Sequence, residues 1–491
     1  MMAFLNDLLW GKVLLVLLVA VGIGFTVASR FVQFRYFGRM FRILGASEAF
    51  KRDKHGHLSS FQALVLSVAG RVGGGNIAGV AVAITLGGPG AVFWMWLVGL
   101  MGMATSFLEC TLAQTYKQSV GDGTYRGGPA YYIVKGLGRH WSWMAGLYSV
   151  LLLLTFGFAF TALQSYAVAT SFGDAFGVPV LYSGIALAIV VGLIIFGGIK
   201  RIARVSEYLV PFMAGAYLLI AFVVLALNIT EVPGVIALIV KSAFGLEPAI
   251  GGGIGAAIMM GLKRGLFSNE AGLGSAPNVA AVAYVPHPAN QGIVQAFSVF
   301  IDTVVICSAT AFMILLSGIY DPASGNDVAG IALTQAALAD HVGEWGRVFV
   351  SLALLMFAFS TILYNYYLGE NSLNFFSRDN QSLFNVFRIA IVLLVCWGAT
   401  TDLGTVFGFA DVTMGLLAVV NLIALIFLFG KGLRILRDFD RQVRDGIEFP
   451  VFDANQHPDM NLDPASWQLE PEDLERINRK LGNDPDAVRE N

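Results

Sequence analysis

The chain has 491 residues, of which 56% are hydrophobic and only 13% are charged. A soluble globular protein carries about 25% charged residues, so this composition predicts a protein whose surface is covered by lipid. The formal net charge of −2 excludes a nucleic-acid binder driven by basic excess. The three cysteines, Cys110, Cys307 and Cys396, all lie in apolar stretches and form neither a disulfide framework nor a spaced metal site.

Eleven apolar stretches are predicted to be membrane-spanning helices. A spanning helix needs about 20 mostly apolar residues. The stretches lie at 12–29, 58–86, 90–116, 142–170, 181–197, 207–228, 248–285, 291–319, 346–370, 383–400 and 404–430. The expected fold class is therefore an all-α integral membrane protein, with the lipid bilayer as a partner.

Lysine and arginine are distributed unequally between the loops that join these spans. Alternate loops, beginning after the first span and ending with the C-terminal segment, carry twenty of them, whereas the other side has only Lys12, Lys241 and Arg347. Cytoplasmic loops are enriched in lysine and arginine. We therefore expect a multi-pass protein of the cell (inner) membrane, with the N-terminus outside and the C-terminus in the cytoplasm.

Two segments lie outside these spans. The loop 229–247 contains an apolar run from Val232 to Phe244, which is too short to span the membrane and is expected to lie on its outer surface. The segment 431–491 is polar and slightly acidic, with scattered proline and aspartate. It is interpreted as a cytoplasmic tail that lies mostly outside the membrane-embedded unit, with a short helix predicted at 471–480.

The second and seventh spans contain glycine clusters that interrupt a helix. The second has Gly73, Gly74 and Gly75, and the seventh has glycine-rich stretches at 251–255 and 261–277. Each glycine costs a helix interior about 1 kcal/mol, and unwound backbone at membrane depth persists only inside protein or beside a water-filled cavity. Two interrupted spans at matched positions indicate an inverted-repeat transporter with its binding site at the breaks. The alternative is that the glycines serve close helix packing.

The positions of the two breaks divide the chain into halves of five spans. The first five-helix repeat is 58–228, the outer loop is 229–247 and the second repeat is 248–430. Five spans per repeat give the two halves opposite orientations, as an inverted repeat requires. Residues 1–57 then form an extra N-terminal span and a cytoplasmic loop, and 431–491 form the tail.

Several long motifs resemble those of the alanine or glycine:cation symporter family, the sodium:alanine symporters. They are RVGGGNIAGV at 71–80, LGGPGAVFWMW at 86–96, MATSFLE at 103–109, YRGGPA at 125–130, KRGLFSNEAGLGSAP at 263–277 and FAFSTIL at 357–363. The resemblance covers roughly residues 60–430 in order. It implies a LeuT-type five-plus-five fold for spans two to eleven, sodium as the coupling ion, and a small neutral amino acid as the substrate.

The resemblance implies a sodium site between the second and ninth spans. Ser360 and Thr361 would supply hydroxyl oxygens, and Ala69 and Val72 would supply backbone carbonyls. Sodium, a hard cation, favours such oxygen ligands. The alternative is that the two hydroxyls bond a carbonyl one turn earlier in their own helix, as serine and threonine in membrane helices do.

A second sodium site is predicted at Asn76, Ser268 and Asp302, with Asn269 as a further candidate. Asp302 lies well inside the eighth span, and an intramembrane carboxylate is a functional candidate by default. The alternative is that Asp302 forms a buried ion pair with a basic residue of one of the interrupted spans.

Five residues are predicted to contact the substrate: Gly74, Gly75, Gln164, Phe267 and Asn365. Free backbone N–H groups in an unwound segment can bind a carboxylate. The family match implies that Gln164 binds the substrate amine and that Phe267 closes the pocket over a small substrate side chain. Family members often carry serine or threonine where this chain has Gly74, and some carry tryptophan where it has Asn365. The pocket is therefore predicted to be wider or more polar.

Four charged residues beside the glycine clusters are interpreted as ion pairs that steady the broken helices. Arg71 is expected to pair with Glu270 or Asp302, and Lys263, Arg264 and Glu270 are expected to form a cytoplasmic gate network. The alternative for Arg71 is that its cation replaces a sodium ion, which would make the carrier independent of sodium.

Together these observations predict a secondary active transporter that couples sodium to the uptake of alanine and glycine, with serine as a further candidate, by alternating access. The alternative is a proton-coupled or sodium-independent amino-acid exchanger on the same fold. An enzyme is not expected, because the chain has no HExxH motif and all six histidines lie in predicted loops or the tail. No nucleic-acid partner is expected, and the sequence specifies no oligomeric state.

Overall fold

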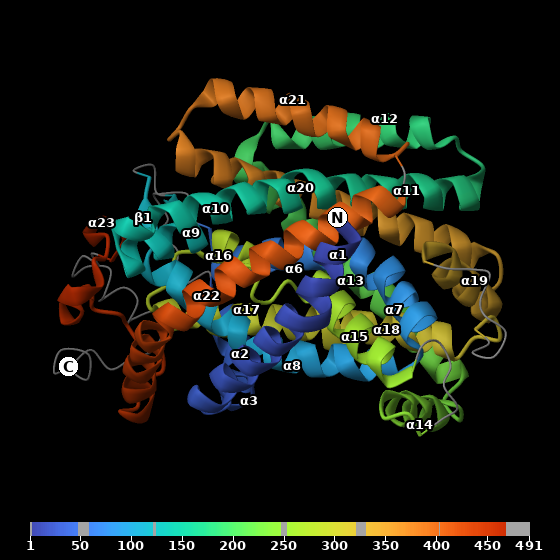
Figure 1. Ribbon diagram of the computed structural model, residues 1–491, viewed down its shortest axis with the longest axis horizontal. Coiled ribbons are helices and arrows are strands. Elements are labelled where there is room, and N and C mark those ends of the chain that lie inside the picture. The colour runs from blue at the N-terminus through green and yellow to red at the C-terminus, as the bar shows by residue number, and fades with distance from the viewer. Residues whose placement is uncertain are drawn as a thin grey trace.

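The computed structural model describes residues 2–47, 58–120, 124–246, 253–320, 330–401 and 403–467 (Figure 1). The first elements are α1 (Met2–Leu8), η1 (Leu9–Val13), α2 (Leu14–Ala28), α3 (Val32–Arg35), α4 (Phe37–Gly45), α6 (Ser60–Arg71), η2 (Gly75–Gly79), α7 (Val80–Gly87), α8 (Gly90–Thr115), β1 (Gln118–Ser119), β2 (Tyr125–Arg126), α9 (Pro129–Tyr132), η3 (Ile133–Leu137), η4 (Arg139–Trp141), α10 (Ser142–Leu152), η5 (Leu153–Phe160) and α11 (Thr161–Phe176). They are followed by α12 (Val180–Ile195), α13 (Gly198–Leu227), α14 (Val232–Ala243), α15 (Gly253–Asn269), α16 (Ser275–Ala280), α17 (Pro288–Val299), η6 (Phe300–Ile306), α18 (Cys307–Leu315), α19 (Ile331–Val342), α20 (Trp345–Phe376), α21 (Gln381–Gly398), α22 (Leu403–Arg444), η7 (Ala454–Gln456), η8 (Pro458–Met460) and α23 (Pro464–Trp467).

Each of the eleven predicted spans coincides with a helix or a run of helices. Within the described residues, eight helices are long and apolar enough to cross a membrane, or nine when the bent pair Ser60–Arg71 and Gly75–Gly87 counts as one span. The two remaining predicted spans are shorter, because α12 has 16 residues and α15 has 17. The prediction of an all-α membrane protein is confirmed.

The predicted interruption of the second span lies between α6 and η2. Helix α6 ends at Arg71, and Val72 takes an extended conformation with φ −80° and ψ 92°. The axes of the two helical pieces on either side of the break differ by 51°. The chain therefore stops being helical at the glycine cluster, and backbone groups that would bond within a helix become free for other partners.

The predicted interruption of the seventh span lies between α15 and α16. In this stretch Glu270, Gly272 and Gly274 have φ angles of 56°, 88° and 81°. Glycine adopts this left-handed conformation without a steric penalty, so the two glycines let the chain turn sharply inside the protein. All residues from 261 to 280 are buried. The breaks in both spans are confirmed.

The helices form two groups that face each other across the breaks (Figure 1). In one group α8 packs against α15 and α17, and α7 packs against α15. In the other group α11 packs against α20, and α12 packs against α21. Helix α6 contacts α20 and α13. The first broken helix thus lies at the border between the two groups, where a bound ion or molecule can touch both.

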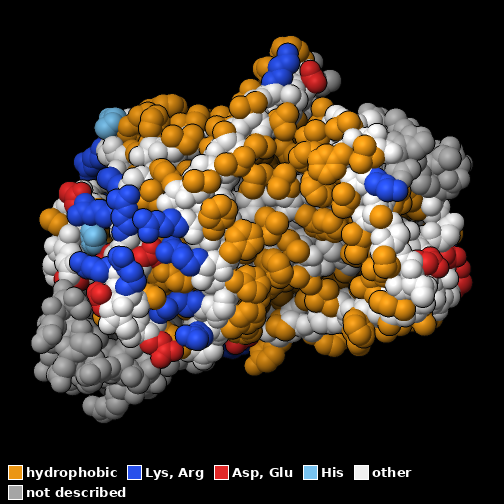
Figure 2. Space-filling model, turned by 90° about the horizontal axis from the view of Figure 1, so that it is seen from below, with side chains coloured by type: hydrophobic (Ala, Val, Ile, Leu, Met, Phe, Trp, Pro, Cys, Tyr) orange, Lys and Arg blue, Asp and Glu red, His pale blue; other side chains and the backbone are white. Residues whose placement is uncertain are grey.

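The outer surface matches the expectation of a lipid-covered protein. Large apolar side chains on α13 point outward, with Phe212 and Phe222 both 66% exposed. Figure 2 shows that hydrophobic side chains cover much of one face, while lysine and arginine gather at one end. We call this the basic end; α9, β1 and α23 lie there (Figure 1). Helices α14 and α19 lie at the opposite end (Figure 1).

The tail differs from its prediction, because residues 445–467 pack against the basic end of the helices. Phe452 and Trp467 form an apolar cluster with Ala63 of α6 and with residues that follow α16. The Trp467 indole Nε1 donates to the Thr115 carbonyl at 3.1 Å, and the Phe452 amide donates to the Pro286 carbonyl at 2.9 Å. The tail up to Trp467 therefore packs against the ends of the helices instead of lying apart from them.

Lys117, which directly follows α8, lies beneath this tail. Its Nζ lies 4.2 Å from the centre of the Tyr125 ring and 4.4 Å from that of Trp467, and it donates to the Ala283 carbonyl at 3.3 Å. Two aromatic rings and one carbonyl replace only part of the water that a free ammonium binds. Burial consequently lowers the pKa of Lys117 to about 7.

Two further differences concern the extent of the helices. Helix α22 continues past the predicted boundary at 430 and ends at Arg444. Helix α19 lies in a stretch for which no helix is predicted. The apolar run after Val232 is the separate helix α14, as its length indicates. The helix predicted at 471–480 lies outside the described residues.

Candidate functional site

Helix α6 brings two backbone carbonyls to the border between the helix groups. Its start is fixed by a capping box, in which Ser59 Oγ accepts from the Gln62 amide and Gln62 Oε1 accepts from the Ser59 amide, both at 3.1 Å. Its end is the break after Arg71. The carbonyls of Ala69 and Val72 lie at that break and are turned toward α20.

Helix α20 presents two hydroxyl groups to these carbonyls. Thr361 Oγ1 lies 3.0 Å from the Ala69 carbonyl and 3.4 Å from the Val72 carbonyl, and Ser360 Oγ lies 3.3 Å from the Ala69 carbonyl. Both hydroxyls also lie 2.9 Å from the Phe357 carbonyl of their own helix. The structure therefore brings all four predicted residues together, and the contact within the helix, which was the alternative, is present as well.

A glycine makes this close approach sterically feasible. A Cβ atom at Gly70 would lie 2.3 Å from the Tyr364 ring of α20, far inside van der Waals contact. Only a glycine at this position lets the end of α6 lie against α20. The resulting cluster of two carbonyl and two hydroxyl oxygens is buried and consists of hard, uncharged ligands of the kind that alkali and alkaline-earth cations prefer.

The second predicted ion site, at Asn76, Ser268 and Asp302, is a closed hydrogen-bond network. Asn76 Nδ2 donates to Asp302 Oδ1 at 2.6 Å, Ser268 Oγ lies 2.9 Å from Asp302 Oδ2, and Thr303 Oγ1 donates to the same oxygen at 2.7 Å. Asn76 Oδ1 accepts from the Gly73 amide at 2.9 Å. The three predicted residues do lie together, and each is completely buried.

A cavity of about 170 Å³ lies beside the first break. Its lining includes Gly74, Gln164, Phe267 and Phe407. The Gly74 amide donates to Gln164 Oε1 at 2.9 Å, which joins the break to α11 of the other helix group. The Phe267 ring of α15 packs at 4.9 Å, centre to centre, against Phe160. Gly74, Gln164 and Phe267 thus meet at one cavity, and their contact with a substrate stays a prediction.

The other two predicted substrate residues lie elsewhere. Gly75 is not among the lining residues, although a Cβ atom on it would lie 3.0 Å from the Phe267 ring. Asn365 also lies outside the lining, one turn after Thr361 on α20. It is fully buried, and neither atom of its amide has a hydrogen-bond partner. A contact between Asn365 and the substrate therefore stays a prediction.

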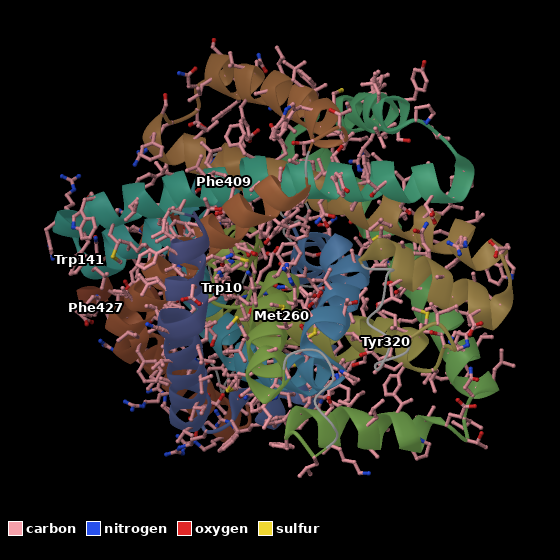
Figure 3. All side chains as sticks on the ribbon, turned by 45° about the vertical axis from the view of Figure 1, so that its right-hand side comes forward. Trp10, Trp141, Met260, Tyr320, Phe409 and Phe427 are labelled. Carbon is pink, nitrogen blue, oxygen red and sulfur yellow. The ribbon has the colours of Figure 1, made fainter. Side chains whose placement is uncertain are left out.

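The predicted gate network divides into separate contacts. Lys263 Nζ lies 2.6 Å from Asp411 Oδ2 on α22, and the N-terminal helices add Trp10, whose Nε1 donates to the Asp411 carbonyl at 3.1 Å (Figure 3). Lys263 precedes Phe267 along α15, whereas Glu270 follows it. Glu270 Oε2 accepts instead from Ser275 at 2.5 Å. Lys263 and Glu270 therefore have separate partners, and their role in a gate stays a prediction.

Arg71 has other partners than the predicted carboxylates. Its guanidinium donates to the Gln295 carbonyl at 3.2 Å, to Ser106 Oγ at 3.0 Å and to Ser298 Oγ. Among the described residues it forms no ion pair, and neither does Asp302. The expected pair between Arg71 and Glu270 or Asp302 is therefore wrong. Arg71 instead fastens the end of α6 to α8 and α17.

Two further charged groups are Glu109, to which sequence reasoning assigned no partner, and Arg264, which it placed in the gate network. Glu109 on α8 accepts from the Gly272 amide at 3.3 Å and from Asn421 Nδ2 at 3.1 Å, so it holds the turn that interrupts the seventh span. The Arg264 guanidinium lies next to the Phe267 and Phe407 rings, which line the cavity, and among the described residues it has no acidic partner. Both residues are charged and lie inside apolar spans, and a charged residue at such a position usually has a partner within the protein. This pattern is the feature of the sequence that could have identified them.

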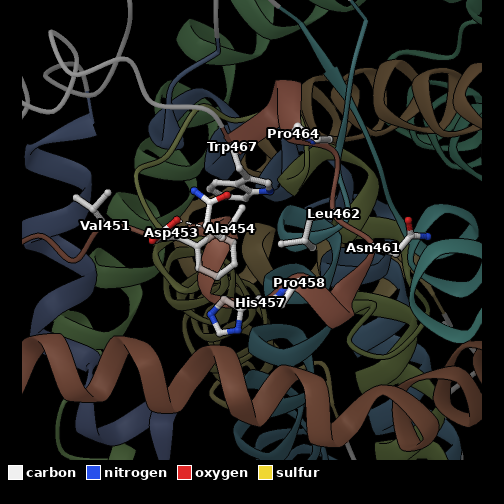
Figure 4. A pocket seen from close by; sticks show the side chains of 11 residues that line it. Val451, Asp453, Ala454, His457, Pro458, Asn461, Leu462, Pro464 and Trp467 are labelled. Atoms are coloured by element: carbon white, nitrogen blue, oxygen red, sulfur yellow. Dashed lines mark hydrogen bonds between the residues drawn. The ribbon is translucent and has the colours of Figure 1, made fainter.

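A larger cavity, of about 660 Å³, lies in the folded tail (Figure 4). All of its lining residues come from 451–467, and they include Phe452, His457 and Trp467. No residue of either broken helix lines it. The smaller cavity at the break is therefore the candidate site, because it combines unwound backbone, a polar side chain and the neighbouring oxygen cluster.

Residues 1–454 match the model of the sodium:alanine symporter family. The chain is 48% identical over 447 residues to the probable sodium/glutamine symporter GlnT of Bacillus subtilis (strain 168), which covers 91% of each chain. It is 45% identical to the amino-acid carrier protein AlsT of the same organism, over 95% of this chain and 97% of that protein. It is 39% identical to the sodium/alanine symporter AgcS of Methanococcus maripaludis, over 87% and 93%.

The fold resembles that of MhsT, whose crystal structure was solved in complex with L-phenylalanine. The two structures have a TM-score of 0.58 at 12% sequence identity, over 89% of this chain and 98% of MhsT. This likeness confirms the LeuT-type fold. The family consists of sodium-coupled amino-acid symporters, so the protein is a transporter and not an enzyme. On the family match and its relatives, the chain belongs to the sodium:alanine symporter family.

Proposed function

We propose that this protein takes up small neutral amino acids, with alanine, glycine and serine as substrates, together with sodium by alternating access. The observation that carries the proposal is the convergence of the Ala69 and Val72 carbonyls with the Ser360 and Thr361 hydroxyls. These four oxygens come from the two helix groups and lie next to a cavity of about 170 Å³.

Sodium at this cluster links the two helix groups. The carbonyls belong to the broken α6 and the hydroxyls to α20, so an ion between them favours one relative position of the groups. A ligand shifts an equilibrium only by its differential affinity for the two states. Sodium that binds only when α6 and α20 are together therefore stabilises that state, and loss of sodium allows α6 to move.

The bond between the Gly74 amide and Gln164 Oε1 suits an amino-acid substrate. A zwitterion inserted here supplies a carboxylate that accepts from the Gly74 amide and an ammonium that donates to Gln164. Both protein groups then keep a partner, which avoids the cost of a buried unsatisfied polar group. Phe267 packs against the substrate side chain.

A second sodium ion at Asn76, Ser268 and Asp302 is also proposed. Asp302 supplies a buried carboxylate close to the break, and the carboxylate oxygens already accept from Asn76, Ser268 and Thr303. Binding of an ion requires Asn76 to turn its amide so that oxygen faces the ion. We further infer that the protein lies in the cell membrane with its basic end in the cytoplasm, following the positive-inside rule.

Uptake into liposomes tests the proposal. Purified protein is reconstituted, and labelled alanine, glycine, serine and glutamine are offered with an inward sodium gradient, with choline in place of sodium, and with an inward proton gradient alone. The proposal predicts accumulation with the sodium gradient only. Uptake driven by the proton gradient and unaffected by sodium would overturn it in favour of the proton-coupled exchanger.

A further inference from the structure

Arg264 is a buried charge that forms no ion pair with the residues that the structure describes. Its side chain lies on α15, three residues before Phe267, and the residue is only 7% exposed. Its Nε and Nη1 atoms are buried and make no hydrogen bond. An arginine keeps its charge inside proteins and can only donate hydrogen bonds. A buried charge of this kind is costly unless an acceptor binds it.

Among the residues that the structure describes, the neighbouring charged groups are taken by other partners. The adjacent Lys263 takes Asp411 Oδ2 at 2.6 Å. Glu270 bonds Ser275 on the far side of Phe267. In the part of the chain that the structure describes, no carboxylate lies within ion-pair distance of Arg264. A molecule bound in the neighbouring cavity would supply such a partner.

The position of Arg264 shows where that molecule would be. The guanidinium carbon lies 5.2 Å from the centre of the Phe407 ring and 6.0 Å from that of Phe267. Both rings line the cavity of about 170 Å³ beside the first break. Gly74 and Gln164 line the same cavity. The lining therefore combines a backbone amide and a side-chain amide with two aromatic rings that lie next to the Arg264 guanidinium.

We propose that Arg264 binds the side-chain carbonyl oxygen of the transported amino acid, so that the cavity prefers the carboxamide class, such as glutamine, to an apolar side chain of equal length. The inference rests on the proposed function, which places the substrate carboxylate and ammonium at Gly74 and Gln164. The methylene groups of the side chain then pack between Phe267 and Phe407, and the carbonyl reaches the guanidinium.

Competition for sodium-driven uptake of labelled alanine tests this proposal. Glutamine and norleucine, an unbranched apolar amino acid of similar length, are titrated against the reconstituted wild-type protein. A hydrogen bond to a charged group predicts that glutamine competes at roughly tenfold lower concentration, or better. In Arg264→Met the ratio of the two concentrations should fall toward one. Arg264→Lys keeps the positive charge but loses the planar pair of N–H donors, so its ratio should lie between those of the wild type and Arg264→Met.

The matched control is Arg347→Met. Arg347, in the first turn of α20, pairs with Asp174 at 3.3 Å, and neither residue lines the cavity. Its removal should therefore leave the ratio unchanged. Where a variant lacks uptake, the shift in thermal midpoint that glutamine and norleucine cause in the purified protein gives the same ratio.

Three results would overturn the proposal. Norleucine competing as well as glutamine in the wild type would show that no carbonyl is recognised. An undiminished ratio in Arg264→Met would assign the recognition to another residue. A fall of the norleucine-to-glutamine concentration ratio to one when gluconate replaces chloride in the buffer would identify an inorganic anion as the partner of Arg264. Absence of any sodium-driven alanine uptake in the wild type would instead refute the proposed function.

Discussion

Thr361→Val removes one oxygen from the proposed sodium site and leaves the shape of the side chain almost unchanged. Thr361 Oγ1 lies 3.0 Å from the Ala69 carbonyl and 3.4 Å from the Val72 carbonyl, and it is the hydroxyl nearest to both. Valine replaces this oxygen by a methyl group. The helix keeps its packing, and the ion loses a ligand from α20.

The size of the effect follows from the contact that is lost. A polar contact to a charged group contributes about 1.5–3 kcal/mol, and each 1.4 kcal/mol is a factor of about ten in an equilibrium constant. The sodium concentration for half-maximal uptake should therefore rise by roughly tenfold to a hundredfold. Ser360→Ala should give a smaller rise, because its hydroxyl lies farther away, at 3.3 Å from the Ala69 carbonyl.

The assay is the initial rate of labelled alanine uptake into liposomes at increasing sodium and constant ionic strength. Ser372→Ala is the matched control on the same helix, because the Ser372 hydroxyl donates to the Leu368 carbonyl of its own helix at 2.9 Å. This control should keep the wild-type sodium dependence. A half-maximal concentration in Thr361→Val within twofold of the wild type would refute the reasoning.

Three further predictions follow from close contacts elsewhere. Gly75→Val should abolish alanine uptake, because a Cβ at this position lies 3.0 Å from two atoms of a phenylalanine ring. Gly74→Thr should retain uptake, because a Cβ at this position lies 3.1 Å from the movable end of a glutamine side chain. Equal loss of uptake in both variants would contradict the cavity geometry. Lys263→Met leaves the Asp411 carboxylate buried alone and should cost about 3–5 kcal/mol of stability. The thermal midpoint in detergent measures this loss, and adding Asp411→Leu should restore most of it. A double variant with a thermal midpoint no higher than that of Lys263→Met would contradict the ion pair. Burial lowers the pKa of Lys117 to about 7, while a free lysine titrates near 10.4. Between these two pH values the protein with a docked tail binds fewer protons than the protein with a free tail. Docking of the tail should therefore become more favourable as pH rises from about 7 to about 10. Hydrogen exchange of the tail amides, expressed relative to the exchange rate of an unstructured peptide at the same pH, should slow over this pH range in the wild type. It should not slow in Lys117→Met.

Hydropathy and glycine content were sufficient to predict the spans and the two breaks. Lipid-facing helices need long apolar stretches, and a glycine cluster such as the one before Asn76 marks unwound backbone without knowledge of the fold. The approach of Ala69 and Val72 to Ser360 and Thr361 required the family resemblance. Composition alone does not pair one helix with another.

Contacts between distant polar residues account for most of what the sequence did not predict. Lys263 and Asp411 are far apart in the chain, and several acidic residues could have served as the partner of either Lys263 or Arg71. Arg71 bonds hydroxyls and a carbonyl instead of a carboxylate. A carbonyl is present at every residue, so no pattern marks the one that a buried arginine uses.

The docking of the tail was missed for a different reason. Residues 445–467 are polar in composition, and polarity predicts exposure. The few apolar side chains among them, including Phe452 and Trp467, are sufficient to seat the segment against α6 and the turn after α16. A handful of anchoring residues thus decides the position of a segment whose average composition indicates the opposite.

The central claim is that sodium binds between the end of α6 and the hydroxyls of α20. Equilibrium binding of radioactive sodium to the purified protein tests it without any transport step. The account predicts saturable binding that is weakened at least about tenfold in Thr361→Val and is unchanged in Ser372→Ala. Sodium binding of wild-type strength in the doubly substituted Ser360→Ala, Thr361→Val protein would contradict it.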